Sequence, residues 1–187
     1  MRVFVTGATG ALGRHLVPGL VAAGHEVTAT TRTLGKAAQL RAAGAEPAVV
    51  DGLDREAVIA AVRSAAPEVI VHEMTALGNT GTPRQLDRDF AVTNELRTRG
   101  TDNLLAAAAM VGTRRVIAQS YTGWPNERSG GPVKTEDDPF DRAPLRGQRE
   151  TLAAIQALEA AVSRDGIALR YGALYGPGAG DEAGARE

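Results

Sequence analysis

Three glycines near the N-terminus have the spacing of a phosphate-binding loop. Gly7, Gly10 and Gly13 follow an apolar stretch at residues 2–6 that reads as a buried strand, and apolar residues then recur at helical spacing over residues 12–21. Glycine permits a tight turn and lets a pyrophosphate approach the backbone closely, while the amides at the start of the helix face the phosphates. An ordinary strand–helix turn without a nucleotide is the alternative. We expect a dinucleotide to contact Gly7, Thr9, Gly10, Ala11, Leu12 and Gly13.

Two further polar residues stand where the second expected strand, residues 26–31, comes to its end. Sites specific for NAD usually place an acidic residue here, which binds the ribose 2′-hydroxyl. This chain has Thr31 and Arg32 instead. A guanidinium carries a permanent charge and several fixed donors, which suit a phosphate. We therefore expect NADP(H) rather than NAD(H) as the cofactor, with a solvated loop arginine as the alternative.

The rest of the chain alternates between expected strands and helices. Strands are expected at residues 2–6, 26–31, 45–50, 69–72, 115–119 and 167–171, and helices at 36–43, 55–65, about 86–111 and 150–164 in addition to the first. This alternation predicts a doubly wound α/β domain of the Rossmann type, a parallel sheet with helices on both faces. We expect a single NAD(P)-binding domain at residues 1–178 and a polar tail at residues 179–187.

Composition excludes several classes of site and partner. The chain has 187 residues and a formal net charge of −1, which gives no basic patch for nucleic acid. It has no cysteine, so disulfides and thiolate metal sites are excluded, and its three histidines lack the spacing of metal ligands. No apolar run reaches the length of a membrane span, and the N-terminus enters a strand directly. We expect a cytoplasmic protein without a signal peptide, a metal site, or a membrane or nucleic-acid partner.

Several segments resemble the extended or atypical branch of the short-chain dehydrogenase/reductase superfamily, which includes NAD-dependent epimerases and dehydratases. The opening TGATG at residues 6–10 resembles that of the family, and residues 71–76 resemble its VIHLAA segment. Residues 94–105 resemble its N…GT-x-NLL helix, and LRYGALYGPG at residues 169–178 resembles its LRxxxxYGPG segment. The resemblance covers essentially the whole chain and implies the same Rossmann-like fold, with the strand order 3-2-1-4-5-6.

The resemblance also implies further contacts with the cofactor. In the family, the first acid of a D-x-x-D segment lies against the adenine amino group, which implies roles for Asp51 and for Gly52 and Leu53 after it. The loop after the fourth strand passes the cofactor, which implies contacts from Met74 and Thr75. Asp54 is expected to be the N-cap of the next helix instead.

Two positions depart from these family patterns. Glu73 is a charge where the VIHLAA pattern is apolar. Asn94 lies three residues further from Gly100 than in the common pattern; we assign it to the cofactor site, with polar packing inside the helix as the alternative.

The catalytic residues of the family are only partly present. Ser120 falls at the place of the catalytic serine, whose hydroxyl would bind the substrate oxygen. A count back from Glu159, taken as the glutamate of the K-x-x-x-E helix, puts Thr151 at the tyrosine position and Ile155 at the lysine position. Neither side chain can transfer a proton at neutral pH. The residues that remain as substitutes are Tyr121, Arg149 and Glu150, and for Tyr121 packing at the sheet edge is the alternative.

Two functions of different classes follow. The first is an NADP-dependent oxidoreductase, epimerase or dehydratase that acts on a small hydroxyl or carbonyl compound, including a nucleotide sugar. The second is a non-catalytic NADP(H)-binding sensor or regulator, which the absent tyrosine and lysine favour. Extended members continue well past the YGPG turn, so the resemblance implies that their substrate lobe is missing here. Relatives also pair through two long helices, which implies a homodimer through residues 86–111 and 150–164.

Overall fold

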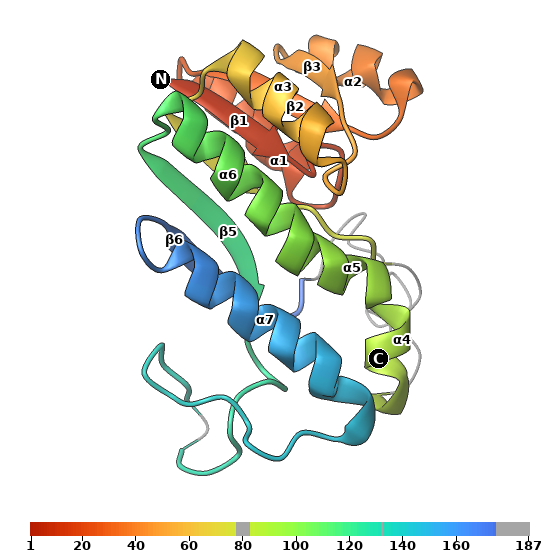
Figure 1. The fold of residues 1–187 in the computed structure, drawn as a ribbon, viewed down its shortest axis with the longest axis vertical. Helices are drawn as coiled ribbons and strands as arrows, with labels where there is room; N and C mark the ends of the chain where they lie inside the picture. Colours follow the sequence, from red (N-terminus) through yellow and green to blue (C-terminus); the bar gives the residue numbers. More distant parts are fainter. Residues whose placement is uncertain (78–82, 132, 175–187) are drawn as a thin grey trace.

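A six-stranded parallel sheet forms the centre of the chain, in the order β3-β2-β1-β4-β5-β6 (Figure 1). The structure is a computed structural model and describes residues 1–77, 83–131 and 133–174. The predicted fold class and strand order are confirmed. The strands are β1 (Arg2–Thr6), β2 (Glu26–Thr31), β3 (Glu46–Val49), β4 (Val69–His72), β5 (Arg115–Tyr121) and β6 (Ile167–Tyr171).

Helices cover both faces of this sheet. Val17 of α1 and Leu40 of α2 pack on one face, whereas α3, α6 and α7 pack on the other, which is visible in Figure 1. The longer helices are α1 (Gly13–Ala22), α2 (Ala37–Ala42), α3 (Arg55–Ala65), α6 (Thr101–Val111) and α7 (Arg149–Val162). The shorter ones are η1 (Leu34–Lys36), η2 (Pro83–Gln85), α4 (Leu86–Asp89), α5 (Ala91–Glu95) and η4 (Arg146–Gln148).

Strand β1 shows why the sequence folds in this way. Its side chains alternate between the two faces, because successive residues of a strand point in opposite directions. Phe4 packs into the core with α3, α6 and α7, while Val3 and Val5 pack into the core with α1 and α2. All three are almost fully buried, which requires the continuous apolar run that the sequence has here.

The stretch expected as one helix over residues 86–111 is divided. Between α5 and α6 lies the segment η3 (Leu96–Gly100), which is wound as a π-helix. Such segments are rare and occur often at functional sites. Arg97 within it is buried, and a Cβ on Gly100 would be in ordinary contact with the side chain of Met74. The π-helical segment therefore lies beside the loop that follows β4.

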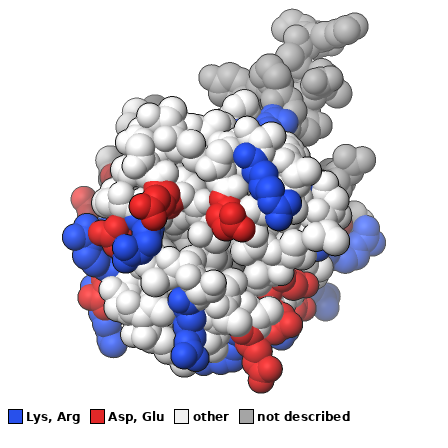
Figure 2. Space-filling view, turned by 90° about the horizontal axis from the view of Figure 1, so that it is seen from above, with Lys and Arg blue, Asp and Glu red and all other residues white. Residues whose placement is uncertain are grey.

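The C-terminal YGPG turn at residues 175–178 and the tail at residues 179–187 lie outside the described residues, so the predicted domain boundary stays a prediction. None of the helices in the described part of the chain is both long enough and apolar enough to cross a membrane. On the face seen in Figure 2, basic and acidic side chains are interspersed.

Candidate cofactor and substrate site

The loop between β1 and α1 depends on its glycines for steric reasons. Gly7 has a φ of +68°, and the amide of Gly10 donates to its carbonyl over 2.9 Å. A Cβ on Gly7 would overlap the main-chain carbonyl of Glu73, and a Cβ on Gly13 would overlap the main chain of Gly7 and Ala8. The loop therefore packs directly against the segment after β4 and leaves its outer surface open. This is the strand–turn–helix arrangement that a pyrophosphate requires.

A cleft of about 210 Å³ lies at the carboxyl ends of the strands beside this loop. Ligands of open parallel sheets bind at this edge. The cleft brings together many of the residues predicted to bind the cofactor. Its lining consists of Gly7, Thr9, Gly10, Thr30, Thr31, Arg32, Lys36, Val50, Gly52, Glu73, Met74, Thr75 and Leu96.

The end of the cleft at β2 is basic. Arg32 and Lys36 both line it, and Arg32 is exposed and accessible to a ligand. Thr31 is buried, and its hydroxyl oxygen accepts from the amide of Thr33 over 3.2 Å, which fixes the turn that leads from β2 to Lys36. Lys36 is a basic residue that the sequence analysis did not assign to the site.

The segment after β3 is held by short-range and long-range contacts. Oδ1 of Asp51 accepts from the amide of Leu53 over 3.0 Å, and Oδ1 of Asp54 accepts from the amide of Ala57 over 3.0 Å. The second contact confirms Asp54 as the N-cap of α3. Asn103 of α6 donates to the carbonyl of Gly52 over 3.0 Å, which ties this segment to the helix layer. Of this group, Gly52 lines the cleft; Asp51 and Leu53 adjoin it.

Glu73 follows β4 and Arg32 follows β2, with β1 between these two strands, and both residues line the cleft. Its side chain is only 6% exposed, its Oε1 accepts from the hydroxyl of Tyr171 over 3.3 Å, and its Oε2 has no hydrogen-bond partner among the described residues. Burial raises the pKa of Glu73 to about 7. A carboxyl group with such a pKa populates both its acid and its base form near neutral pH.

His72 fixes the backbone on which Glu73 lies. The amide of Met74 donates to Nδ1 of His72 over 3.2 Å, so Nε2 carries the proton and donates to the hydroxyl of Thr101 over 3.1 Å. Burial lowers the pKa of His72 to about 4, so the ring is neutral at pH 7. This histidine therefore has a structural role, in which it connects the loop after β4 to α6.

Arg97 is a buried cation that the sequence analysis did not single out. It is 6% exposed, and its Nη1 has no hydrogen-bond partner among the described residues. Burial lowers the pKa of Arg97 to about 10, while Tyr121 at the end of β5 favours its charged form. A count of three residues back from Gly100 puts Arg97, rather than Asn94, where the common pattern of the family has its asparagine.

The structure places Ser120 in a buried polar network rather than in the cleft lining. Its hydroxyl donates to Oε1 of Glu159 over 2.5 Å, and Arg170 donates to both oxygens of the same carboxylate, over 2.8 Å each. The Arg170 guanidinium lies 4.6 Å from the ring centre of Phe140. Ser120 is 1% exposed. Its predicted contact with a substrate stays a prediction, and its observed contact is with Glu159.

The tyrosine and lysine positions of the family are occupied by packed side chains. The amide and the hydroxyl of Thr151 both donate to Oδ1 of Asp87 over 2.8 Å, and Nδ2 of Asn94 donates to the Thr151 hydroxyl over 3.1 Å. Thr151 and Ile155 are almost completely buried. Asn94 thus makes a polar packing contact, which was the alternative to its predicted role in the cofactor site. Its contact with a cofactor stays a prediction.

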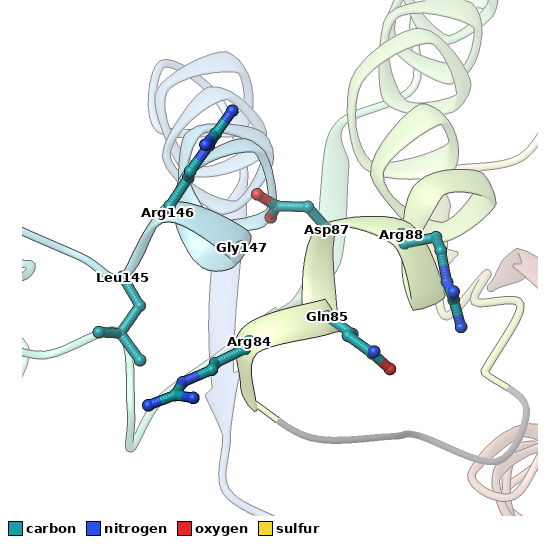
Figure 3. Close-up of a pocket in the computed structure, with 7 residues that line it drawn as sticks. All are labelled: Arg84, Gln85, Asp87, Arg88, Leu145, Arg146 and Gly147. Atoms are coloured by element: carbon teal, nitrogen blue, oxygen red, sulfur yellow. The ribbon is translucent and has the colours of Figure 1, made fainter.

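A second hollow of about 560 Å³ adjoins this helix junction (Figure 3). In Figure 3 the carboxylate of Asp87 points toward the start of α7, whereas Arg84 and Arg88 point away from it. A Cβ on Gly147 would overlap the main chain of Arg84, so the two segments are in direct contact. The residues that line the hollow are Arg84, Gln85, Asp87, Arg88, Leu145, Arg146 and Gly147. The carboxylate of Asp87 accepts hydrogen bonds from Thr151. The hollow and the cofactor cleft have no lining residue in common.

Comparison with known proteins agrees with this geometry. The model of the NAD dependent epimerase/dehydratase family matches residues 3–186. The chain is similar to a 3-diazoavenalumate denitrifying reductase from Streptomyces sp, with 44% identity over 189 residues that cover 96% of this chain and 58% of the relative. It is also similar to a 4-hydroxy-2-methyl-3-oxo-4-farnesyl-3,4-dihydroquinoline-1-oxide ketoreductase from Stigmatella aurantiaca. The identity is 32% over 160 residues, which cover 84% of this chain and 45% of the relative.

Among solved structures, the UDP-glucose 4-epimerase of Thermus thermophilus in complex with NAD is similar, with a TM-score of 0.75 and 25% identity, over 95% of this chain and 57% of that one. The chain thus spans about half the length of the curated relatives described above. The glycine loop, the cleft at the carboxyl ends of the strands, the strand order and the match over nearly all residues lead to one conclusion: the chain belongs to the NAD dependent epimerase/dehydratase family.

Proposed function

We propose that this protein is an NADP(H)-dependent oxidoreductase that acts on a small hydroxyl or carbonyl compound. The observation that carries the proposal is the cleft itself, because it joins a glycine cradle at Gly7 and Gly10 to a basic end at Arg32 and Lys36. The cradle fits a pyrophosphate, since Gly7 and Gly10 line the cleft before α1 and present backbone there without a side chain. The two basic side chains fit a 2′-phosphate, which distinguishes NADP from NAD.

Different residues of the chain would bind different parts of the cofactor. The amides of the loop before α1 would bind the pyrophosphate, Arg32 and Lys36 would bind the 2′-phosphate, and Gly52 in the cleft lining would contact the cofactor. When bound, the reduced cofactor supplies a hydride. The relatives from Streptomyces and Stigmatella are named as reductases, which supports reduction as the direction of the reaction. The epimerase neighbour supports nucleotide sugars as a second substrate class.

A non-catalytic NADP(H) sensor of the same fold is the second candidate. The observation that favours it is the burial of Thr151 and Ile155, which stand at the two proton-transfer positions of the family. Neither residue can serve as an acid or a base there.

A fluorescence titration with NADPH and NADH tests the cofactor choice. We expect binding that favours NADPH, and Arg32→Ala should weaken it about 10-fold, which corresponds to roughly 1.4 kcal/mol. NADH binding should change little in this variant. Arg63→Ala is the matched control, because Arg63 is exposed on α3 and outside the cleft lining. Equal affinity for both cofactors in the unaltered chain would contradict the assignment of Arg32.

Turnover separates the two candidate functions. NADPH oxidation would be followed with benzaldehyde, acetophenone, menadione and glyceraldehyde, called the substrate panel below. Oxidation above the blank with any member supports the oxidoreductase. Tight NADPH binding without oxidation across the panel supports the sensor.

A further inference from the structure

The proposed reduction requires an acid, and the family's usual positions do not supply one. Thr151 is completely buried, and its hydroxyl donates a hydrogen bond to Asp87. Ile155 has no ionisable group. A carbonyl oxygen that receives electrons during reduction must gain a proton to become a hydroxyl. The proton therefore has to come from another residue near the cleft.

Glu73 is the residue of the cleft lining that meets this requirement. The ionisable side chains of the lining are Arg32, Lys36 and Glu73, and the two basic ones belong to the β2 end. Glu73 is nine-tenths buried, and its Oε2 has no partner among the described residues. A buried carboxyl oxygen without a partner is costly, so an unpaired oxygen on a residue that lines a binding cleft indicates contact with a ligand.

The order of the strands gives the position of Glu73 along a bound dinucleotide. The basic end lies at β2 and the glycine loop follows β1, so the second nucleoside extends toward the next strand, β4. Glu73 follows β4 directly, and Tyr171, which contacts it, ends β6. The carboxyl group therefore lies at the end of the cleft where the reacting half of the cofactor would bind.

We propose that Glu73 is the acid that protonates the substrate oxygen and that Tyr171 is its positioning residue; this assignment rests on the oxidoreductase function proposed above. The carbonyl carbon would receive the hydride that NADPH supplies when it is bound. The electron pair of the C=O π bond moves to the oxygen, which takes the proton from Oε2 of Glu73 and leaves a carboxylate. A proton from water restores the acid before the next turnover. In the oxidative direction the carboxylate accepts the proton of the alcohol.

The contact between Tyr171 and Glu73 favours this division of roles. The phenol donates to Oε1 over 3.3 Å, which orients the carboxyl group and leaves Oε2 as the oxygen that holds the proton. Burial and the nearby carboxyl raise the pKa of Tyr171 to about 12, so the phenol remains a donor at neutral pH. Arg97, Tyr121 and the neutral His72 are the other ionisable groups near the ends of β4 and β5, and none of them hydrogen-bonds the carboxyl group in the described structure.

The first test measures the proton on Glu73 without cofactor or substrate. The chain would be labelled with ¹³C at the glutamate carboxyl carbon, and the resonance that disappears in Glu73→Gln is assigned to Glu73. We expect its titration midpoint near pH 7. Tyr171→Phe should move the midpoint higher, because the phenol hydrogen bond stabilises the carboxylate. A midpoint in the ordinary range of an exposed glutamate would overturn the proposal.

The second test is kinetic and uses the member of the substrate panel with the highest kcat. Glu73→Gln keeps the shape of the side chain and removes the acid, so kcat should fall about 100-fold or more while NADPH affinity stays within about threefold. Glu56→Gln is the matched control, because Glu56 is exposed on α3 and makes the same change of charge away from the cleft. Its kcat should equal that of the unaltered chain.

The outcomes separate the failure of this assignment from the failure of the proposed function. Turnover that persists in Glu73→Gln with kcat within about threefold would overturn the role of Glu73 and leave the oxidoreductase intact. NADPH binding without turnover in the unaltered chain would overturn the oxidoreductase function, and the acid role with it. Loss of kcat in Glu73→Gln, with retained NADPH binding and a midpoint near pH 7, supports both.

Discussion

The hydroxyl of Ser120 donates to Oε1 of Glu159 over 2.5 Å, and through this carboxylate it is linked to Arg170. Burial alone would raise the pKa of Glu159, but the hydrogen bonds from Arg170 and Ser120 outweigh it and keep the pKa below its ordinary value. The three side chains come from β5, α7 and β6. They connect the last two strands to the helix that covers them.

Ser120→Ala tests whether this network or the substrate contact is the main role of Ser120. Loss of a hydrogen bond to a charged group should lower the free energy of unfolding by about 2 kcal/mol, measured by urea denaturation. Thr28→Val, which replaces a hydroxyl by a methyl group in β2, provides a comparison outside the network. Unchanged stability together with a lost kcat would instead show that Ser120 acts on the substrate.

Gly13→Ala and Gly19→Ala form a matched pair within α1. A Cβ at Gly13 would overlap the main chain of Gly7 and Ala8, whereas a Cβ at Gly19 meets no atom within 4 Å. We expect Gly13→Ala to destabilise the chain by about 1–3 kcal/mol and to abolish NADPH binding. Gly19→Ala should stabilise it by about 0.5–1 kcal/mol, because alanine has the higher helix propensity. Thermal unfolding and the NADPH titration check both; equal effects would contradict the loop packing.

The buried carboxyl group of Glu73 predicts a pH dependence of stability. Because the folded state raises the pKa of Glu73 to about 7, it binds more protons than the unfolded state, and stability is lost as pH rises through this value. Glu73→Gln removes this dependence. The free energy of unfolding of the variant minus that of the unaltered chain should therefore rise by on the order of 2 kcal/mol from pH 5 to pH 8. Urea midpoints at the two pH values measure the difference. The exposed Glu56→Gln should show none.

The buried Arg97 predicts an unusual response to the loss of a charge. Its Nη1 has no hydrogen-bond partner in the described structure, and burial lowers the pKa of Arg97 to about 10. Arg97→Met keeps much of the volume without the desolvation cost, so the free energy of unfolding should stay constant or rise by about 1 kcal/mol. Urea denaturation measures it. A loss of several kcal/mol would show that the guanidinium is fully paired in solution.

The predicted homodimer can be tested on the exposed faces of its helices. Val92 of α5 is 47% exposed and Met110 of α6 is 61% exposed. If the chain pairs through these helices and α7, Val92→Asp with Met110→Glu should shift the sedimentation coefficient from that of a dimer to that of a monomer. Val133→Glu is the control, since Val133 is 79% exposed in the loop before α7. A monomer in the unaltered chain would contradict the prediction.

Much of the fold could be predicted from the sequence, because strands, turns and helices depend on neighbouring residues. The run before Gly7 had to form a buried strand, the three glycines had to form a turn, and Asp54 had to cap a helix, since these features follow from local apolar patterning, steric freedom and hydrogen bonding. The alternation of strands and helices then predicted the parallel sheet. The basic residue at the end of β2 was also visible in the sequence, and Arg32 does line the cleft.

The candidate site could not be predicted to the same extent, because it is formed by contacts between residues that lie far apart in the sequence. Glu73 and Tyr171 lie 98 residues apart, and Thr151 and Asp87 lie 64 residues apart. A sequence shows that a residue can ionise or donate, but burial and partners determine its pKa and role, and these arise from packing between distant segments. The sequence shows that Glu73 is a charged residue where the family pattern is apolar. The burial of its carboxyl group beside the cleft, with no partner for Oε2 among the described residues, was decided by the tertiary structure alone.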